Sequence, residues 1–218
     1  MQAMDITYIG HSSFKIRGKH VTIITDPFNE NAVGLKFPKN LTADIVTVSH
    51  DHDDHNFSSQ IGGNPYVIGG PGEYEVKGIS IYGIRAFHDT QKGAERGKNT
   101  MYRMEIDGMT VLHAGDLGHE PSDDMLEEMG NVNVLLIPVG GFYTIDAKTA
   151  AAVVHEIEPS VVIPMHFNRP ELKKEVFSKL SGLDAFLKEI GKSDILPQAK
   201  LTVTKDKLPA EMQVVVLN

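Results

Sequence analysis

The segment His50–His55 constrains this chain more than any other part of its sequence. Its order is His-Asp-His-Asp-Asp-His, so three imidazoles and three carboxylates occupy six consecutive positions. Residues 43–48 just before it are mostly apolar or β-branched, which indicates a short buried strand. A cluster this dense at the end of a strand indicates a cation site. The simpler alternative is an acidic, histidine-rich surface turn.

The spacing within this segment predicts two neighbouring cation positions. His50 and His52 are two residues apart where a strand ends, and alternate side chains of an extended chain share a direction. Both imidazoles can therefore approach one cation. Asp54 and His55 are adjacent and are expected to point to a second position close to the first.

Three later residues stand where further ligands of such a site are expected. His88, Asp116 and His166 each follow an apolar strand-like run. Ligands at strand ends are held by a stiff scaffold, which a metal site needs. His113 competes with His88 for the same role. We favour His88, because His113 lies within the apolar run that leads to Asp116.

Composition limits the chemistry of the site and the class of partner. The chain has no cysteine, which excludes disulfides and thiolate ligands. Histidine and carboxylate ligands suit zinc, manganese or iron. The formal net charge of −8 argues against a broad basic surface, so neither nucleic acid nor a membrane surface is an expected partner. No apolar run is long enough to span a membrane, and residues 1–5 lack signal-peptide features, so we expect a cytoplasmic protein.

The order of expected elements favours a layered α/β fold in one domain, residues 1–218. Strands are expected at 6–9, 13–16, 20–25, 45–48, 66–68, 74–77, 79–87, 100–106, 109–113, 132–139, 161–163, 201–203 and 214–216. Helices are expected at 121–129, at 146–158 and from 170 to 190 with a break at 181–182, and Asp54 is expected to cap a short helix. Residues 29–42 and 89–99 are expected to be loops. Strands therefore dominate early, and strands and helices alternate later.

The pattern His50-x-His52-x-Asp54-His55, followed by His88, Asp116 and His166, resembles the metallo-β-lactamase superfamily of metallohydrolases. Four further turns are similar to its compact branch that includes ascorbate-phosphate lactonase-like proteins: 10–12, 25–27, 70–74 and 163–166. This resemblance implies a four-layer αβ/βα sandwich. It also implies that the metals lie at one edge, between the two sheets.

The resemblance further implies how two divalent ions are held, with zinc expected first and manganese or iron as alternatives. The implied ligands are His50, His52 and His88 for one ion, Asp54, His55 and His166 for the other, and Asp116 as a bridge. Asp26 is implied to orient a ligand imidazole from behind, since such rings usually donate their other N–H to a carboxylate or carbonyl. The alternative for Asp26 is a turn residue before Pro27.

The expected reaction is hydrolysis by a hydroxide shared between two metals, since metal coordination lowers the pKa of water to roughly 7 for zinc. Asp54 is expected to orient this nucleophile or accept its proton. His11 is expected to line the pocket and to bind or protonate the substrate, unless it is a structural turn residue. Tyr143 is a candidate for a hydrogen bond to a substrate oxygen, and an exposed loop aromatic is its alternative. A residual positive charge on the metals favours a small anionic ester, lactone or phosphodiester.

Three alternatives remain open from the sequence. One is a phosphodiesterase or nuclease, and another is a metal-binding protein of this fold without turnover. The third is a redox di-iron centre, but oxygen-reducing relatives carry a glutamate at the position of His52, so His52 favours hydrolysis. Assembly with further copies of the chain as a homo-oligomer is also left open.

Overall fold

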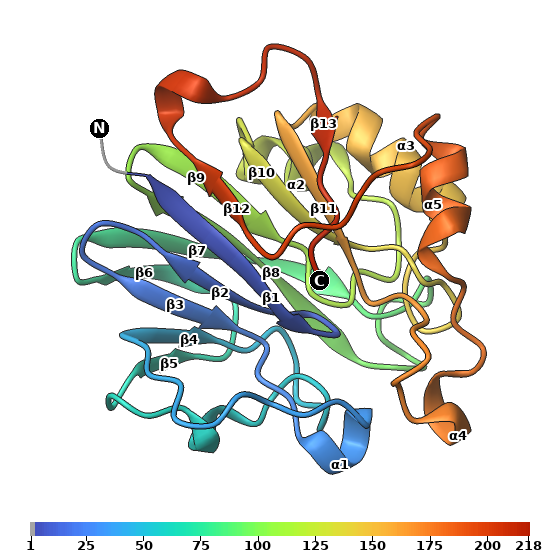
Figure 1. Cartoon of the computed structure of the whole chain (residues 1–218), viewed down its shortest axis with the longest axis horizontal. Helices are drawn as coiled ribbons and strands as arrows, with labels where there is room; N and C mark the ends of the chain where they lie inside the picture. Colours follow the sequence, from blue (N-terminus) through green and yellow to red (C-terminus); the bar gives the residue numbers. More distant parts are fainter. Residues whose placement is uncertain (1–2) are drawn as a thin grey trace.

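Two β-sheets face each other in the computed structural model, which describes residues 3–218 (Figure 1). Residues 1 and 2, which begin the expected domain 1–218 and the segment 1–5, lie outside the described residues. In sheet order, the first sheet contains β12 (Leu201–Val203), β1 (Met4–Gly10), β2 (Ser13–Arg17), β3 (Thr22–Thr25), β4 (Ile45–Thr47) and β5 (Tyr66–Ile68). The second contains β13 (Gln213–Val214), β11 (Val161–Met165), β10 (Val134–Pro138), β9 (Met109–His113), β8 (Lys98–Ile106), β7 (Ile79–Phe87) and β6 (Gly72–Val76).

The inner faces of both sheets pack into one apolar core. β1 alternates buried and half-buried residues along its length, and Met4, Ile6 and Tyr8 point into this core. Tyr102 and Leu136 of the second sheet belong to the same cluster and are fully buried. The period of two in β1 is that of a strand with one face on the core.

The central strands of the second sheet are buried on both faces. β10 and β11 are parallel and consist entirely of buried residues. Such continuous apolar runs are typical of parallel strands covered on both sides. The outer face packs against α2 (Asp123–Met129), α3 (Ala147–Ile157) and α5 (Leu183–Glu189), which complete a second apolar cluster. Figure 1 shows α3 and α5 on one side of the molecule.

The outer face of the first sheet is covered by shorter elements. A third apolar cluster contains Ile24 and Val46 from the sheet, Val33 from α1 (Glu30–Val33) and Phe177 from α4 (Lys174–Phe177). The 3₁₀ turns are η1 (Ser58–Gln60) and η2 (Lys205–Lys207). The layered α/β fold is therefore confirmed, with a helical layer on this side that is reduced to single turns.

Three local predictions differ from the structure. Residues 29–42 contain the helical turn α1, whose N-cap Asn29 accepts a hydrogen bond from the Asn31 amide. Asp54 does not cap a helix, because the amides of His55 and Asn56 close a turn onto the carbonyl of His52. Between residues 170 and 190 only α4 and α5 are helical, and Gly182, at the predicted break, is the N-cap of α5.

The strand directions bring the predicted site residues to one edge. β1, β3 and β4 run in the same direction in the first sheet, and β7, β9 and β11 run in the same direction in the second. The two sets of carboxyl ends meet where the amide of His166 donates to the carbonyl of His11 at 3.0 Å. No helix among the described residues is long and apolar enough to cross a membrane.

Candidate metal centre

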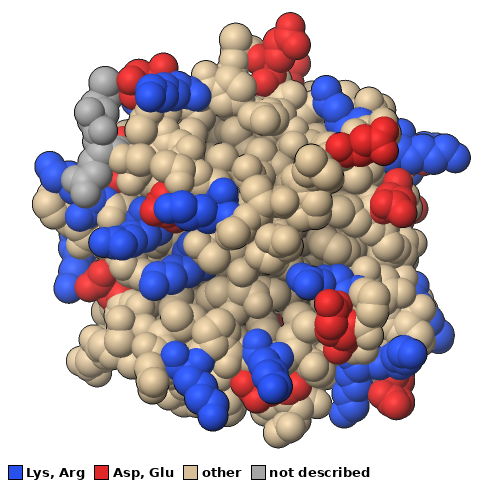
Figure 2. Space-filling view, viewed as in Figure 1, with Lys and Arg blue, Asp and Glu red and all other residues tan. Residues whose placement is uncertain are grey.

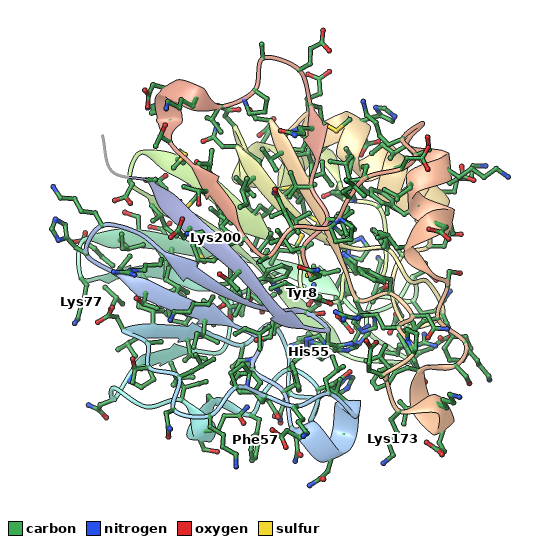
Figure 3. The ribbon with its side chains drawn as sticks, in the orientation of Figure 1. Tyr8, His55, Phe57, Lys77, Lys173 and Lys200 are labelled. Atoms are coloured by element: carbon green, nitrogen blue, oxygen red, sulfur yellow. The ribbon has the colours of Figure 1, made fainter. Side chains whose placement is uncertain are left out.

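Six strand ends contribute to one cluster of histidines and aspartates. His11 follows β1, Asp26 follows β3, the segment 50–55 follows β4, His88 follows β7, Asp116 comes after β9 and His166 follows β11. Figure 3 shows His55 near the end of β1, among other nitrogen-bearing side chains. Residues more than a hundred positions apart in the sequence thus meet at the edge between the sheets.

The first group consists of His50, His52 and His88. One ring nitrogen of each lies within 4.8 Å of those of the other two. The ring centroid of His50 lies 4.5 Å from that of His52 and 4.7 Å from that of His88. His50 and His88 are buried and His52 is exposed, so this group opens to solvent on one side.

The second group consists of Asp54, His55 and His166, together with His11. Asp54 Oδ2 lies 3.0 Å from His11 Nε2 and 3.6 Å from His55 Nε2. The His11 ring also packs against the His166 ring at a centroid distance of 4.1 Å. The structure therefore brings together the three predicted members and adds His11 at ligand distance.

Asp116 lies between the two groups and contacts both. Its Oδ2 is 3.3 Å from His88 Nε2 and 3.1 Å from His166 Nε2, and its Oδ1 is 3.3 Å from His55 Nε2. The residue is only 1% exposed, so these imidazoles replace water around a buried carboxylate. A position that touches members of both groups is the position expected of a bridging ligand.

The donor set fits divalent cations. Three buried atoms of the candidate ligands, His50 Nε2, His55 Nε2 and Asp116 Oδ1, have no hydrogen-bond partner among the described residues. Buried polar atoms without a partner are rare and need an explanation such as an ion. Two ligands of a tetrahedral zinc ion lie about 3.4 Å apart, since each sits about 2.1 Å from the metal. The contacts of 3.1–3.6 Å around Asp116 and Asp54 match that separation.

The electrostatics of the buried groups point the same way. Burial alone would raise the pKa of Asp116, but the imidazoles of His166 and His55 hold it well below its ordinary value. Burial would lower the pKa of His55, but Asp116 and Asp54 raise it well above its ordinary value. The neighbouring imidazoles thus favour the ionised form of the Asp116 carboxylate, as bound cations would.

Asp26 ties the two groups together from behind. Its Oδ2 accepts hydrogen bonds from His55 Nδ1 at 2.8 Å and from the Ser49 hydroxyl at 2.6 Å, and its Oδ1 accepts from the Ser49 amide. The Ser49 hydroxyl also lies 2.9 Å from His50 Nδ1. These bonds leave Nε2 of both His50 and His55 directed at the site. Such support from behind is what ligating imidazoles usually have.

The competing residue His113 is engaged elsewhere. Its Nε2 lies 2.8 Å from the carbonyl of Ser12, and its Nδ1 accepts a hydrogen bond from the amide of Gly115. Burial lowers the pKa of His113, so the ring is neutral. Nε2 anchors the 10–13 turn and Nδ1 holds the Gly115 amide, so both nitrogens are occupied and the geometry favours His88 over His113 as a ligand.

Several residues at the site have unusual backbone conformations. His11, Asp26 and His166 have φ values of 55°, 39° and 52°, in the left-handed region that non-glycine residues seldom adopt. Such strain tends to occur at functional sites that the surrounding structure holds firmly. Gly140 packs so closely on the carbonyl of His166 that an added Cβ would clash with this oxygen. The His166 turn is thus held tightly by a backbone approach that only glycine permits.

A cavity of about 340 Å³ opens onto the two groups. It is lined by His52, Asp54, His88, Glu95, Arg96, Asp116, Tyr143, His166, Val176 and Phe177. Tyr143 lies in its wall, but its hydroxyl already donates to the carbonyl of Val176 at 2.8 Å. His11 does not line the cavity. It is 1% exposed and lies behind Asp54, which differs from the expectation that His11 lines the pocket.

The pH dependence of the metal-free fold follows from the buried imidazoles. Burial lowers the pKa of His50 to about 3 and of His11 to about 4, and it also lowers the pKa of His113. The unfolded chain binds protons at these positions from about pH 6.5 downward, whereas the folded chain binds them only at lower pH. The folded state therefore loses stability as pH falls. The pKa of the more exposed His52 is lowered as well, and only the raised pKa of His55 acts in the opposite direction among these histidines.

We therefore expect chelator-treated protein to lose about 2–3 kcal/mol of stability between pH 7.5 and 5.5, a fall in Tm of several degrees. Thermal melts across this range measure it. A His113→Gln variant should show a shallower slope. A Tm that rises on acidification would contradict the assignment of neutral buried imidazoles.

Sequence reasoning missed two kinds of residue at the site. Ser49 links Asp26 to His50, and its position immediately before His50 was the available signal. Asp89 and Arg96 belong to the segment 89–99, where no apolar periodicity marks either residue. The buried Asp89 accepts four backbone hydrogen bonds within this segment, which makes a compact turn of a stretch expected to be an exposed loop.

Comparison with known proteins agrees with this geometry. Residues 5–166 match the model of the beta-lactamase superfamily domain family. A UPF0173 metal-dependent hydrolase from Thermococcus onnurineus is 31% identical over 208 residues, which cover 82% of this chain and 92% of that protein. A protein of the metallo-β-lactamase superfamily from Thermotoga maritima has a structure with a TM-score of 0.80 and 38% identity, covering 98% of each chain. Igni18, a metallo hydrolase from Ignicoccus hospitalis, shares the fold at 24% identity, with a TM-score of 0.69 and coverage of 93% of this chain and 99% of that one.

This chain belongs to the metallo-β-lactamase superfamily and, within it, to the UPF0173 metal-dependent hydrolases. The resemblance inferred from the His50–His55 motif is confirmed, as is the class of metal-dependent hydrolase.

Proposed function

We propose that this protein is a dinuclear metal-dependent hydrolase of a small, anionic ester, lactone or phosphodiester. The observation that carries the proposal is the position of Asp116. Its carboxylate contacts His88 of one group and both His55 and His166 of the other, at 3.1–3.3 Å. A single metal needs only one group, whereas two groups joined by a buried carboxylate suit a pair of ions.

In this proposal His50, His52 and His88 hold one ion, Asp54, His55 and His166 hold the other, and Asp116 bridges them. Zinc is proposed first, since the donors are imidazoles and carboxylates, and manganese or iron are the alternatives. When bound, the ions would supply Lewis acidity and an activated water at neutral pH. Asp26 keeps His55, and through Ser49 also His50, with Nε2 directed at the site.

Asp54 is the carboxylate placed to handle a proton. Its side chain is 21% exposed to the cavity, and its Oδ2 accepts a hydrogen bond from His11 Nε2 at 3.0 Å. Burial lowers the pKa of His11 to about 4, so at neutral pH the ring is uncharged and can donate to Asp54. His11 therefore orients Asp54 and acts on the leaving group only through it, since it does not reach the cavity.

Charge supports a small anionic substrate. Two divalent ions carry four positive charges, of which Asp54 and Asp116 neutralise two, so the centre attracts anions. Lys and Arg gather toward the left of the molecular face in Figure 2 and are mixed with Asp and Glu elsewhere on it, and the formal net charge of the chain is −8. This mixture suits a small molecule better than a long nucleic acid. A single cytoplasmic domain spanning residues 1–218 is part of the same proposal.

The proposal is tested by removing and restoring the metal. Elemental analysis of the purified protein should find about two ions per chain. Chelation should abolish hydrolysis in a panel of phosphodiester, lactone and thioester substrates, and zinc, manganese or iron should restore it. His52→Ala should lose bound metal and activity, whereas His155→Ala, which removes an exposed histidine of α3, should retain both. A wild-type protein that binds no metal would refute the proposal.

A further inference from the structure

We propose that Arg96 binds a second anionic group of the substrate, remote from the bond that is hydrolysed. The enzyme would then select substrates that carry a carboxylate or phosphate at their far end. This inference rests on the proposed function, because it takes the two histidine groups as the place where the reactive end binds.

Arg96 is the only lysine or arginine among the residues that line the cavity. The same cavity wall contains His52, His88 and Asp116 of the candidate metal groups. The Arg96 side chain is 30% exposed, so its guanidinium is partly withdrawn from water and still open to a ligand. A substrate that fills this space and reaches the metals at one end therefore meets Arg96.

The backbone holds Arg96 in place. Asp89 follows the candidate ligand His88 directly and is 4% exposed. Its Oδ2 accepts hydrogen bonds from the amides of Arg96 at 2.7 Å and of Glu95 at 3.0 Å. Its Oδ1 accepts hydrogen bonds from two further amides of the turn. The amide of His88 donates to the carbonyl of Gly97 at 3.0 Å and closes the turn on its other side. A candidate metal ligand and the cavity cation are thus fixed on one compact turn, as a positioned recognition residue requires.

Most of the hydrogen-bonding capacity of Arg96 is free for a ligand. Among residues 3–218 its side chain pairs only with Glu95, at 3.2 Å from Nη1 to Oε2, and its guanidinium carbon lies 6.0 Å from the centre of the Tyr143 ring. Guanidinium has five N–H donors and binds carboxylate or phosphate through two parallel bonds. The Glu95 side chain is 60% exposed, and exposed pairs of this kind are weak. An anionic ligand can therefore displace Glu95 without breaking a buried contact.

The remaining wall supplies an apolar surface between the two ends. Val176 and Phe177 line the cavity, and the Tyr143 hydroxyl donates a hydrogen bond to the carbonyl of Val176. The substrate class that fits has a hydrolysable group at one end, a short apolar middle and an anion at the other end.

Binding measurements test this inference without depending on turnover. Metal-loaded wild type is titrated by calorimetry with the dicarboxylates succinate, glutarate and adipate, each against the monocarboxylate of the same chain length. At least one dicarboxylate should bind about 10–100-fold more tightly than its partner, because a charge-assisted bidentate pair is added. Arg96→Gln should abolish this preference and leave monocarboxylate affinity and metal content unchanged. Arg96→Lys should restore part of it.

Two further variants sharpen the test. Glu95→Gln should strengthen dicarboxylate binding, since it removes the competing carboxylate. Lys92→Gln removes an exposed cation of the same turn that does not line the cavity, and it should change nothing. Equal binding of every pair by the wild type, or an equal loss for both members of a pair in Arg96→Gln, would overturn the inference. A dicarboxylate preference in a protein that hydrolyses no substrate would instead count against the proposed function alone.

Discussion

Asp116→Asn is expected to weaken metal binding by roughly 10²–10⁴-fold and to lower kcat/KM at least as far. Asp116 is fully buried and contacts His55, His88 and His166, so its carboxylate serves both groups. Asparagine keeps the shape but removes the negative charge that would face the proposed cations. Breaking a buried charge pair costs about 3–5 kcal/mol, and each 1.4 kcal/mol corresponds to a factor of ten in affinity.

Competition with a calibrated chelator measures this loss, and elemental analysis counts the ions that remain. Asp53→Asn is the matched control, since Asp53 belongs to the same histidine-rich segment but is exposed and contacts neither group through its side chain. If Asp116→Asn lost only one of two ions and the second kept wild-type affinity, Asp116 would be a terminal ligand and the bridging assignment would be wrong.

Residues at strand ends were the part of the site that sequence alone could locate. The apolar runs before His88, Asp116 and His166 predicted strands β7, β9 and β11, and these strands are present with small shifts of their ends. Strands that run in the same direction place their carboxyl ends at one edge. When each of these strands is followed by a residue that can bind a metal, the sequence therefore predicts which side chains meet, even where they lie more than a hundred positions apart.

Contacts set by irregular backbone could not be predicted in this way. Asp89 builds its turn through hydrogen bonds to backbone amides, which carry no residue-specific signal. The Arg96 side chain reaches the cavity because of that turn. His11 was located in a turn, but its depth behind Asp54 depends on a left-handed φ of 55° and on packing against His166 and Phe177. Periodicity has no information about such positions.

The short helical layer over the first sheet has a similar explanation. Val33 is the only buried residue of α1, and Phe177 the only one of α4. A single buried residue on a four-residue turn gives no helical repeat, so residues 29–42 resemble a loop in sequence. In α3, by contrast, Ala150, Ala151, Val153 and Val154 are buried, and the predicted helix 146–158 is confirmed with Asp146 as its N-cap.

Asp26→Asn is expected to weaken binding of both metals, by about 10–100-fold each. The Asp26 carboxylate accepts hydrogen bonds from His55 Nδ1 and from the Ser49 hydroxyl, and Ser49 in turn contacts His50 Nδ1. One carboxylate thus fixes the orientation of a ligand in each group. Asparagine is the sharpest substitution, because it tolerates the left-handed φ of 39° at this position and changes only the charge and the pattern of donors.

Ser49→Ala separates the two branches of this network. It removes the link from Asp26 to His50 but leaves the 2.8 Å contact between Asp26 and His55 intact. Stepwise zinc titration against a chelator should therefore show one weakened equivalent in Ser49→Ala and two in Asp26→Asn. Asp26 is fully buried, and His113, His55 and Ser49 hold its pKa low although burial acts to raise it. The Asn variant should therefore also melt at a lower temperature when metal-free. Two equivalents of unchanged affinity in Asp26→Asn would show that the ligands are oriented without Asp26, and the two groups would then be independent sites joined only by Asp116.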